Sequence, residues 1–197
     1  MEYSEYAGEI EDQEKKETRR KSAKPLLWVG MVGILMAFAG LTSAYLIRHS
    51  DSDWVSFELP NSFFISTASI LLSSITLILA KRAVKKDDLK QVKQFVGLSL
   101  IFGLGFVIAQ FYSYGVLVEN GHYFTGSNIS SSFLYVLTGV HLAHVISGII
   151  VLIVLLVRSL MEKYTAEEHL GLSLGSTYWH FLDVLWIYLL LFLLFIR

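Results

Sequence analysis

Five apolar segments run through this sequence, and their length constrains the fold more than any other feature. Each segment is long enough to cross a hydrocarbon core of about 30 Å as a helix. Polar and apolar residues do not alternate at a period of two within them, which argues against membrane-spanning β-strands. The sequence therefore predicts an all-α integral membrane protein, a five-helix transmembrane bundle. The expected spans are residues 26–47, 63–80, 95–118, 132–157 and 178–196.

The composition agrees with a membrane protein and narrows its chemistry. Charged residues make up only 17% of the chain, below the level of about a quarter that is typical of soluble domains. The absence of cysteine excludes disulfides, cysteine-ligated iron–sulfur clusters and thiolate copper centres. Residues 1–24 are polar and contain no apolar stretch typical of a secretory signal. We expect them to form a flexible cytoplasmic tail, or to lie on a partner, before the transmembrane domain of residues 25–197.

The distribution of lysine and arginine predicts the orientation in the membrane. Five spans place the N-terminal tail and two of the loops on one side, and these segments hold fourteen of the sixteen lysine and arginine residues. Only Arg48 and Arg197 fall on the other side. Because cytoplasmic segments are rich in lysine and arginine, we expect a cytoplasmic N-terminus and a periplasmic C-terminus. The fourteen residues are Lys15, Lys16, Arg19, Arg20, Lys21, Lys24, Lys81, Arg82, Lys85, Lys86, Lys90, Lys93, Arg158 and Lys163.

Small residues recur at steps of three and four in the first two spans, so each series lies along one helical face. Such residues let helix backbones approach closely, and buried hydroxyl groups can bond between helices. We therefore expect these faces to bring the first two helices close together. The residues are Gly33, Ala37 and Gly40 in the first span and Ser66, Ser69 and Ser73 in the second. Because the polar face of the second span is uncharged and no internal repeat is evident, a small transporter or channel is the less favoured alternative.

Histidines within the spans are the residues best suited to hold a haem or a metal. Counted from the cytoplasmic ends of the expected spans, His180 lies about 3–5 Å deep and His144 about 20 Å deep. Because the two axial imidazoles of one haem need matching depth, this mismatch argues against a membrane-anchored cytochrome. His141 and His144 are three residues apart, but no cysteine or carboxylate lies at their depth to complete a metal site. We expect both imidazoles to form hydrogen bonds within the bundle.

Asp183 is the only carboxylate well inside an apolar segment, and His180 precedes it by three residues on the same helical face. We expect a satisfied polar pair near the membrane interface that fixes the position of the fifth helix. The alternative is a proton relay, which requires further titratable groups in sequence across the membrane. The chain supplies no such line of groups, so the structural role is favoured.

Two polar motifs stand out in the last two spans. Residues 138–148 read Thr-Gly-Val-His-Leu-Ala-His-Val-Ile-Ser-Gly, and residues 178–186 read Tyr-Trp-His-Phe-Leu-Asp-Val-Leu-Trp. They resemble Thr-Gly-x-His-x-x-His-x-x-x-Gly and Tyr-Trp-His-Phe-x-Asp-x-x-Trp, two signatures of the cytochrome c oxidase subunit III family. Phe38-Ala39-Gly40 and Gln110-Phe111-Tyr112 look like further landmarks. The resemblance covers about residues 26–197, and the two motifs occur in the family's order and spacing.

The resemblance implies an accessory subunit of a proton-pumping haem-copper oxygen reductase of aerobic respiration, in a bacterial inner membrane. The haems and copper of such an oxidase belong to subunits I and II, so no catalytic residue, cofactor site or metal site is expected in this chain. Subunit III packs on subunit I, beside subunit II and small subunits, holds structural phospholipid in a cleft and helps to sustain proton uptake. A supercomplex with a quinol:cytochrome c oxidoreductase is a further assembly to consider, and no nucleic acid partner is expected. The electron donor stays open between cytochrome c, which we prefer, and a quinol.

The resemblance also implies roles for individual residues. The polar motif residues expected to hold the bundle together are Thr138, His141, His144, Ser147, His180, Asp183 and Trp186. The residues expected to contact lipid or another subunit are Gln110, Tyr112 and Trp179. The chain departs from the longer, seven-helix form of the family by lacking its first two helices, so another subunit must close the lipid cleft. It also has Ile34 where many members carry a membrane-embedded glutamate.

Overall fold

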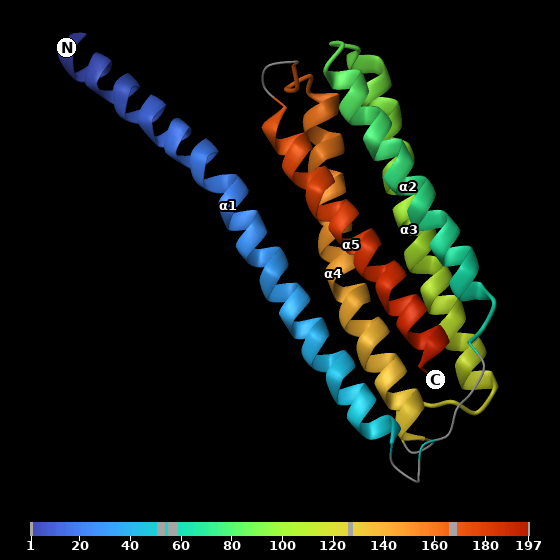
Figure 1. The fold of residues 1–197 in the computed structure, drawn as a ribbon. Helices are drawn as coiled ribbons and strands as arrows, with labels where there is room; N and C mark the ends of the chain where they lie inside the picture. The colour runs from blue at the N-terminus through green and yellow to red at the C-terminus, as the bar shows by residue number, and fades with distance from the viewer. Residues whose placement is uncertain (1, 51–53, 55–58, 126–127, 166–168, 197) are drawn as a thin grey trace.

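Five α-helices make up almost all of the chain that the computed structural model describes (Figure 1). The described residues are 2–50, 54, 59–125, 128–165 and 169–196, and between residues 2 and 20 only the side chains of Glu14, Glu17 and Thr18 are described. The helices are α1 (Glu2–His49), α2 (Ser62–Val84), α3 (Leu89–Glu119), α4 (Ile129–Leu160) and α5 (Leu170–Phe195). Each contains a stretch long and apolar enough to cross a membrane. The predicted all-α fold with five spans is therefore confirmed.

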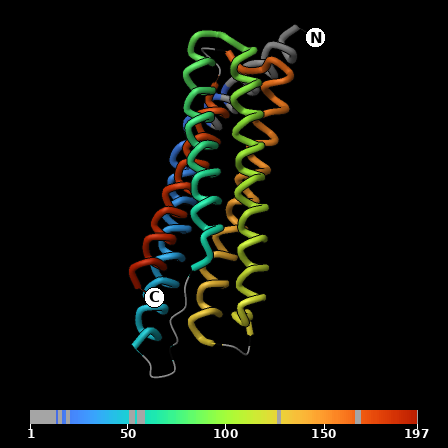
Figure 2. Tube along the Cα trace, turned by 90° about the vertical axis from the view of Figure 1, so that its right-hand side faces the viewer, coloured from blue at the N-terminus to red at the C-terminus, as the bar shows by residue number. Residues whose placement is uncertain are grey.

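Helix α5 lies at the centre of the bundle and packs against α1, α2 and α4. Helices α2 and α3 form a long antiparallel pair, shown side by side in Figure 2, and α3 also packs against α4. Within the described residues, α1 contacts α4 and α5 but not α2. Figure 1 shows that α1 follows the bundle over its C-terminal half and diverges from it toward the N-terminus.

The small-residue face of α1 points away from the bundle, so the expected contact between the first two helices is wrong. The exposed residues of this face are Gly33, Ala37 and Gly40. A Cβ atom added at either glycine would meet no other atom within 4 Å. On the opposite face, Phe38 and Tyr45 are buried and make ring contacts with residues of α4 and α5. Because dispersion attraction grows with the number of atoms in contact, the aromatic face of α1 packs on the bundle better than its glycine face.

Serine side chains of α2 hold it against α3 through hydrogen bonds between the helices. Ser69 donates to Phe102 O at 2.8 Å, Ser73 donates to Ser99 O at 2.7 Å, and Ser66 accepts from Gln110 Nε2 at 2.9 Å. Such bonds satisfy hydroxyl and amide groups that lipid cannot solvate. The small-residue face of α2 therefore lies at a close helix contact, with α3 and not α1 as its partner.

Every helix begins before the apolar segment that predicted it, and the shifts at α1 and α5 are the largest. Helix α1 starts at Glu2, so the expected flexible tail of residues 1–24 differs from the structure, which is helical from residue 2 onward. Glutamate, lysine, arginine and alanine all favour the helix, and Lys21 Nζ bonds to Glu17 Oε2 one turn earlier, at 3.2 Å. Helix α5 starts at Leu170 and not near residue 178. This second shift changes the depth of every polar residue on α5.

The orientation in the membrane stays a prediction, and single cysteines can test it because the chain has none of its own. Lys86 is exposed in the turn between α2 and α3. In intact cells, Lys86→Cys should react with a membrane-impermeant maleimide only after permeabilisation. Glu119→Cys, at the opposite end of α3, should react without permeabilisation and is the control. Labelling of Lys86→Cys from the periplasm would contradict the prediction. The charge count behind it also includes residues outside the described part, namely Arg197 and the side chains of Lys15, Lys16, Arg19 and Arg20.

Candidate functional site

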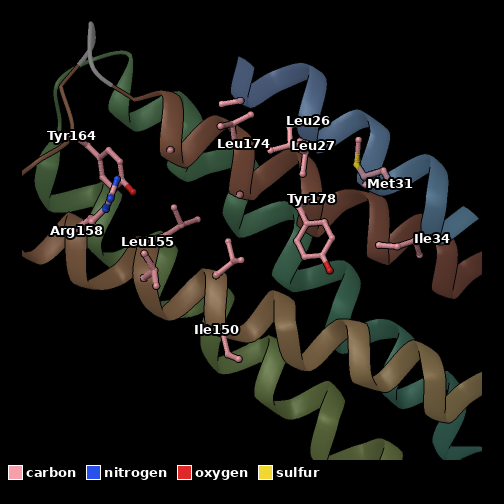
Figure 3. A pocket seen from close by; sticks show the side chains of 16 residues that line it. Leu26, Leu27, Met31, Ile34, Ile150, Leu155, Arg158, Tyr164, Leu174 and Tyr178 are labelled. Atoms are coloured by element: carbon pink, nitrogen blue, oxygen red, sulfur yellow. The ribbon is translucent and has the colours of Figure 1, made fainter. Parts of the chain in front are cut away.

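A mostly apolar pocket of about 620 Å³ lies between α1, α4 and α5 (Figure 3). Leu26 and Met31 of α1, Ile150 of α4 and Leu174 of α5 contribute to its walls. The pocket forms where α1 diverges from the other helices (Figure 1) and where Gly30 of α1 has no side chain to fill the space. Ligand pockets in proteins commonly have volumes of about 300–1,000 Å³, so this space can hold a sizeable apolar molecule.

Arg158 and Tyr164 bring polar atoms to one end of this pocket (Figure 3). Arg158 lies in the last turn of α4, and Tyr164 is buried in the loop that follows. Both side chains approach Gly171 of α5, since its Cβ position lies 3.4 Å from the Tyr164 hydroxyl oxygen and 3.6 Å from Arg158 Nη1. Burial raises the pKa of the Tyr164 hydroxyl, and the neighbouring Arg158 offsets only part of that rise. At neutral pH the pocket therefore ends in a neutral phenol beside a positive guanidinium.

His141 lies at the centre of the bundle, where the structure corrects the expectation that it forms hydrogen bonds. Its side chain is fully buried, and neither ring nitrogen has a hydrogen-bond partner among the described residues. The ring stacks on Trp186 with 5.3 Å between centroids and meets Phe38 and Phe106 edge-on at 6.2 Å. Aromatic packing thus holds this imidazole, and a charged ring would be costly in such apolar surroundings.

The other motif residues of α4, and Trp186 of α5, do form hydrogen bonds. Within α4, Thr138 donates to Leu134 O at 2.7 Å, and His144 Nδ1 lies 2.8 Å from Val140 O. Between helices, Tyr114 of α3 donates to Thr138 at 3.0 Å, and Ser147 Oγ lies 2.7 Å from the Tyr178 hydroxyl of α5. Trp186 Nε1 of α5 donates to Thr67 of α2 at 2.9 Å. Three of these bonds join different helices, so the two sequence motifs contribute to the contacts among α2, α3, α4 and α5.

The depth argument against a shared haem is wrong. The 2.7 Å bond between Ser147 and Tyr178 places these residues at one level of α4 and α5, so His144 and His180 lie at similar depth. The error came from the start of α5, which lies eight residues earlier than the apolar pattern predicted. The two rings nevertheless face different helices, because His144 contacts a ring of α1 and His180 bonds to a serine of α2. In the described residues, no three His, Cys, Asp or Glu side chains form a group that could hold a metal.

His180 and Asp183 lie on one face of α5, but the structure corrects the expectation of a satisfied pair near the interface. His180 Nδ1 is 2.5 Å from Ser74 Oγ and 3.8 Å from Asp183 Oδ2, while His180 Nε2 is 3.0 Å from Ser176 Oγ. The Asp183 carboxyl group is buried, and neither of its oxygens has a hydrogen-bond partner among the described residues. The imidazole is therefore satisfied by serines, whereas the carboxyl group is not.

Two of the three residues expected to contact lipid or another subunit are buried in the bundle. Trp179 is only 1% exposed, and so is Gln110, which donates to Ser66 of α2. Trp179 lies well inside α5 because that helix begins at Leu170. Tyr112 is 68% exposed, and its contact with lipid or a subunit stays a prediction.

The sequence does not single out the polar end of the pocket. It marks Arg158 as a charge that predicts orientation, and Tyr164 and Gly171 lie between the fourth and fifth predicted spans. A signal was present, since Arg158 ends a long apolar segment and Tyr164 follows within two turns, a pattern typical of the membrane interface. The sequence does not predict that α1 diverges from α4 and α5, and this divergence creates the space of the pocket.

Comparison with known proteins gives one consistent family. The family model described as cytochrome c oxidase subunit III matches residues 55–196. A cytochrome c oxidase subunit 3 of Bacillus sp. strain PS3 is 30% identical over 167 residues, which is 82% of this chain and 80% of that protein. The subunit 3 of Corynebacterium diphtheriae is 32% identical and that of Thermostichus vulcanus 31%, each over 83% of this chain and 82% of the relative.

Proposed function

This chain belongs to the cytochrome c oxidase subunit III family, and from that membership we propose that it is the accessory subunit III of a proton-pumping haem-copper oxygen reductase. The observation that carries the proposal is the family match over residues 55–196, which includes both motifs of α4 and α5. The positions of His144 and His180 agree with it, because His144 contacts a ring of α1 whereas His180 bonds to a serine of α2. A quinol oxidase is the alternative, since electron entry belongs to another subunit.

The partners implied by this function are the other subunits of the oxidase in a bacterial inner membrane. Subunit I is the direct partner that we propose, with subunit II and small subunits in the same complex. The experiment is to purify the complex through a tag on this chain and to identify the chains that co-migrate. Subunits I and II, which carry the haems and copper between them, are expected at equal stoichiometry. Recovery of this chain alone, or with transport proteins only, would contradict the proposal.

We further propose that the pocket between α1, α4 and α5 binds a structural phospholipid. Its walls are apolar along most of their length and suit an acyl chain, whereas Arg158 at one end suits an anionic phosphate. Under the predicted orientation, Arg158 lies at the cytoplasmic end of α4, which is the level of the lipid headgroups. A phospholipid of the cytoplasmic leaflet thus matches both ends of the pocket.

Filling the pocket should displace this lipid. Gly30 lines the pocket, and a Cβ atom there would meet nothing within 4 Å, so Gly30→Leu can add a side chain to the space without a clash. We expect Gly30→Leu and Arg158→Gln to lower the phospholipid that stays with the purified complex after a detergent wash, as measured by mass spectrometry. Gly33→Leu, on the exposed face of the same helix, is the matched control. Equal retention in all three variants would place the lipid elsewhere.

A further inference from the structure

A cluster of polar side chains lies at the contact between α2 and α5, inside the spanning part of both helices. It consists of Ser74 on α2 and of Ser176, His180 and Asp183 on α5. His180 lies ten residues after Leu170, the first residue of α5, which is about 15 Å along the helix axis. Polar groups at such depth are costly and are commonly functional. The proposed function assigns no task to these four residues.

Both ring nitrogens of His180 are bonded to serine hydroxyl groups. Nδ1 lies 2.5 Å from Ser74 Oγ, and Nε2 lies 3.0 Å from Ser176 Oγ. A hydroxyl group can either donate or accept a hydrogen bond. With a neutral ring, one serine donates to the unprotonated nitrogen and the other accepts from the N–H group. With an imidazolium, both serines accept. The ring can therefore gain or lose a proton without moving.

Asp183 is the most weakly bonded member of the cluster, because Ser74 and His180 are the side chains that interact with it and neither reaches it in good hydrogen-bond geometry. Its side chain is only 4% exposed, and neither carboxyl oxygen has a hydrogen-bond partner among the described residues. In that part of the chain, its one ion-pair contact is with His180, at 3.8 Å from Nδ1 to Oδ2. An ionised carboxylate without partners is far more costly to bury than a neutral acid. The geometry therefore favours a proton on Asp183, with His180 as the neighbour that can take it.

The titratable groups on the helices around α5 are engaged elsewhere. On α4, His141 stacks on Trp186, His144 bonds to the backbone of its own helix, and Arg158 lines the pocket. On α2 and α1, the side chains that bond to α5 are the hydroxyls of Ser74, Thr67 and Thr42. No charge from these contacts compensates an ionised Asp183, which leaves His180 as its partner.

Further hydroxyl groups continue from the cluster toward the start of α5. Ser173, Ser176 and Thr177 precede His180 at helical steps of three and four, so they lie on or beside its face. All three are buried or half-buried, and the side chain of His180 itself keeps 27% exposure. Hydroxyl groups can pass protons along a line by donating and accepting in turn. Ser176 is the hydroxyl of this set that bonds to His180, and Thr177 donates to the backbone oxygen of Ser173 at 2.9 Å. All three lie between His180 and the end of α5 that is predicted to be cytoplasmic.

We propose that His180 and Asp183 form a binding site for a single exchangeable proton within the membrane. The proton rests on the Asp183 carboxyl group. The proton reaches His180 through Ser74, because Ser74 Oγ lies 2.5 Å from Nδ1 and its hydroxyl also interacts with the Asp183 carboxyl group. The Asp183 O–H bond breaks as Ser74 Oγ takes that proton, and Ser74 passes its own proton to Nδ1, which leaves a carboxylate and an imidazolium with no change in net charge. Release of the Nε2 proton toward Ser176 then lets the site exchange with the end of α5. The proposal goes beyond the accessory role and rests on the α2–α5 geometry alone.

Infrared difference spectroscopy of the purified complex tests this site. The wild-type minus Asp183→Asn spectrum should contain the carbonyl band of a protonated carboxylic acid, and this band should shift in D2O. In His180→Gln the band should remain, but its exchange in D2O should slow by roughly a hundredfold, as expected when a positioned proton acceptor is removed. Asp87→Asn, which removes an exposed carboxyl group from the turn between α2 and α3, is the control and should lose no such band.

Two results would overturn the proposal. The first is the absence of a carboxylic acid band in the wild-type minus Asp183→Asn spectrum, which would mean that Asp183 is ionised. The second is an exchange rate in His180→Gln equal to that of the wild type, which would mean that the imidazole does not carry the proton. If Asp183→Asn fails to assemble, Asp183→Glu keeps the acid and should move the same band to a different frequency. An unchanged spectrum in Asp183→Glu would equally exclude the site.

Discussion

Trp179→Ala is expected to lower the free energy of unfolding of this chain by about 3–5 kcal/mol, the range for removing a buried tryptophan. Trp179 is only 1% exposed, and its ring lies in the space left by two glycines. A Cβ atom at Gly103 of α3 would lie 2.9 Å from Trp179 Cη2, and one at Gly148 of α4 would lie 3.0 Å from Trp179 Cε3. The indole therefore joins α3, α4 and α5 at one point. The surrounding backbones cannot easily collapse on the cavity that alanine would leave.

The comparison that isolates this effect is Trp28→Ala on α1, where the indole is 61% exposed. It removes the same side chain without creating a cavity and should change the thermal unfolding temperature of the chain little. Unfolding in lipid nanodiscs, followed by circular dichroism, gives both values under one condition. If the two variants unfolded at the same temperature, Trp179 would not contribute to the core in the way its contacts indicate.

The number and type of the helices could be predicted because a membrane leaves few choices for the backbone. Lipid offers no hydrogen bonds, so apolar segments of this length must form helices. The end of a helix is different, because residues near the interface can be polar and still helical. Residues 170–177 contain two glycines, two serines and a threonine, which resembles a loop. In the structure Gly175 packs against Leu155 of α4, so tertiary contact decides that this segment is helical.

That one boundary explains several of the differences at the candidate site. A fifth helix that began near residue 178, as the apolar pattern predicted, would have His180 near the interface and Trp179 at the membrane surface. With α5 starting at Leu170, Trp179 lies in the core and His180 lies level with His144. The orientation of α1 was unpredictable for another reason. Its glycine face and its aromatic face both suit helix packing, and the sequence does not say which one meets this chain and which one is left for a partner.

Removing this chain should leave an oxidase that starts at a nearly normal rate and then loses activity over successive turnovers. The expectation rests on the proposed function. The described residues offer no set of ligands for a metal, and the histidines at similar depth face different helices. On the proposed function, oxygen reduction is completed by other chains, and their haem spectra should be unchanged after depletion of this subunit.

The later loss of activity is expected because removing this chain uncovers surfaces that it would otherwise shield. The glycine face of α1 and the outer faces of α2 and α3 are broad, apolar and exposed, so we expect them to face lipid or subunit I in the assembled oxidase. If subunit III lies beside the proton-entry region of subunit I, its removal exposes that region to altered lipid and water, and proton delivery should fall behind electron delivery. The measurement is oxygen consumption against time for complexes with and without this chain, at equal haem content. A complex that is inactive from the first turnover while its haems remain intact would show that this chain takes part in the chemistry, and the accessory role would then be wrong.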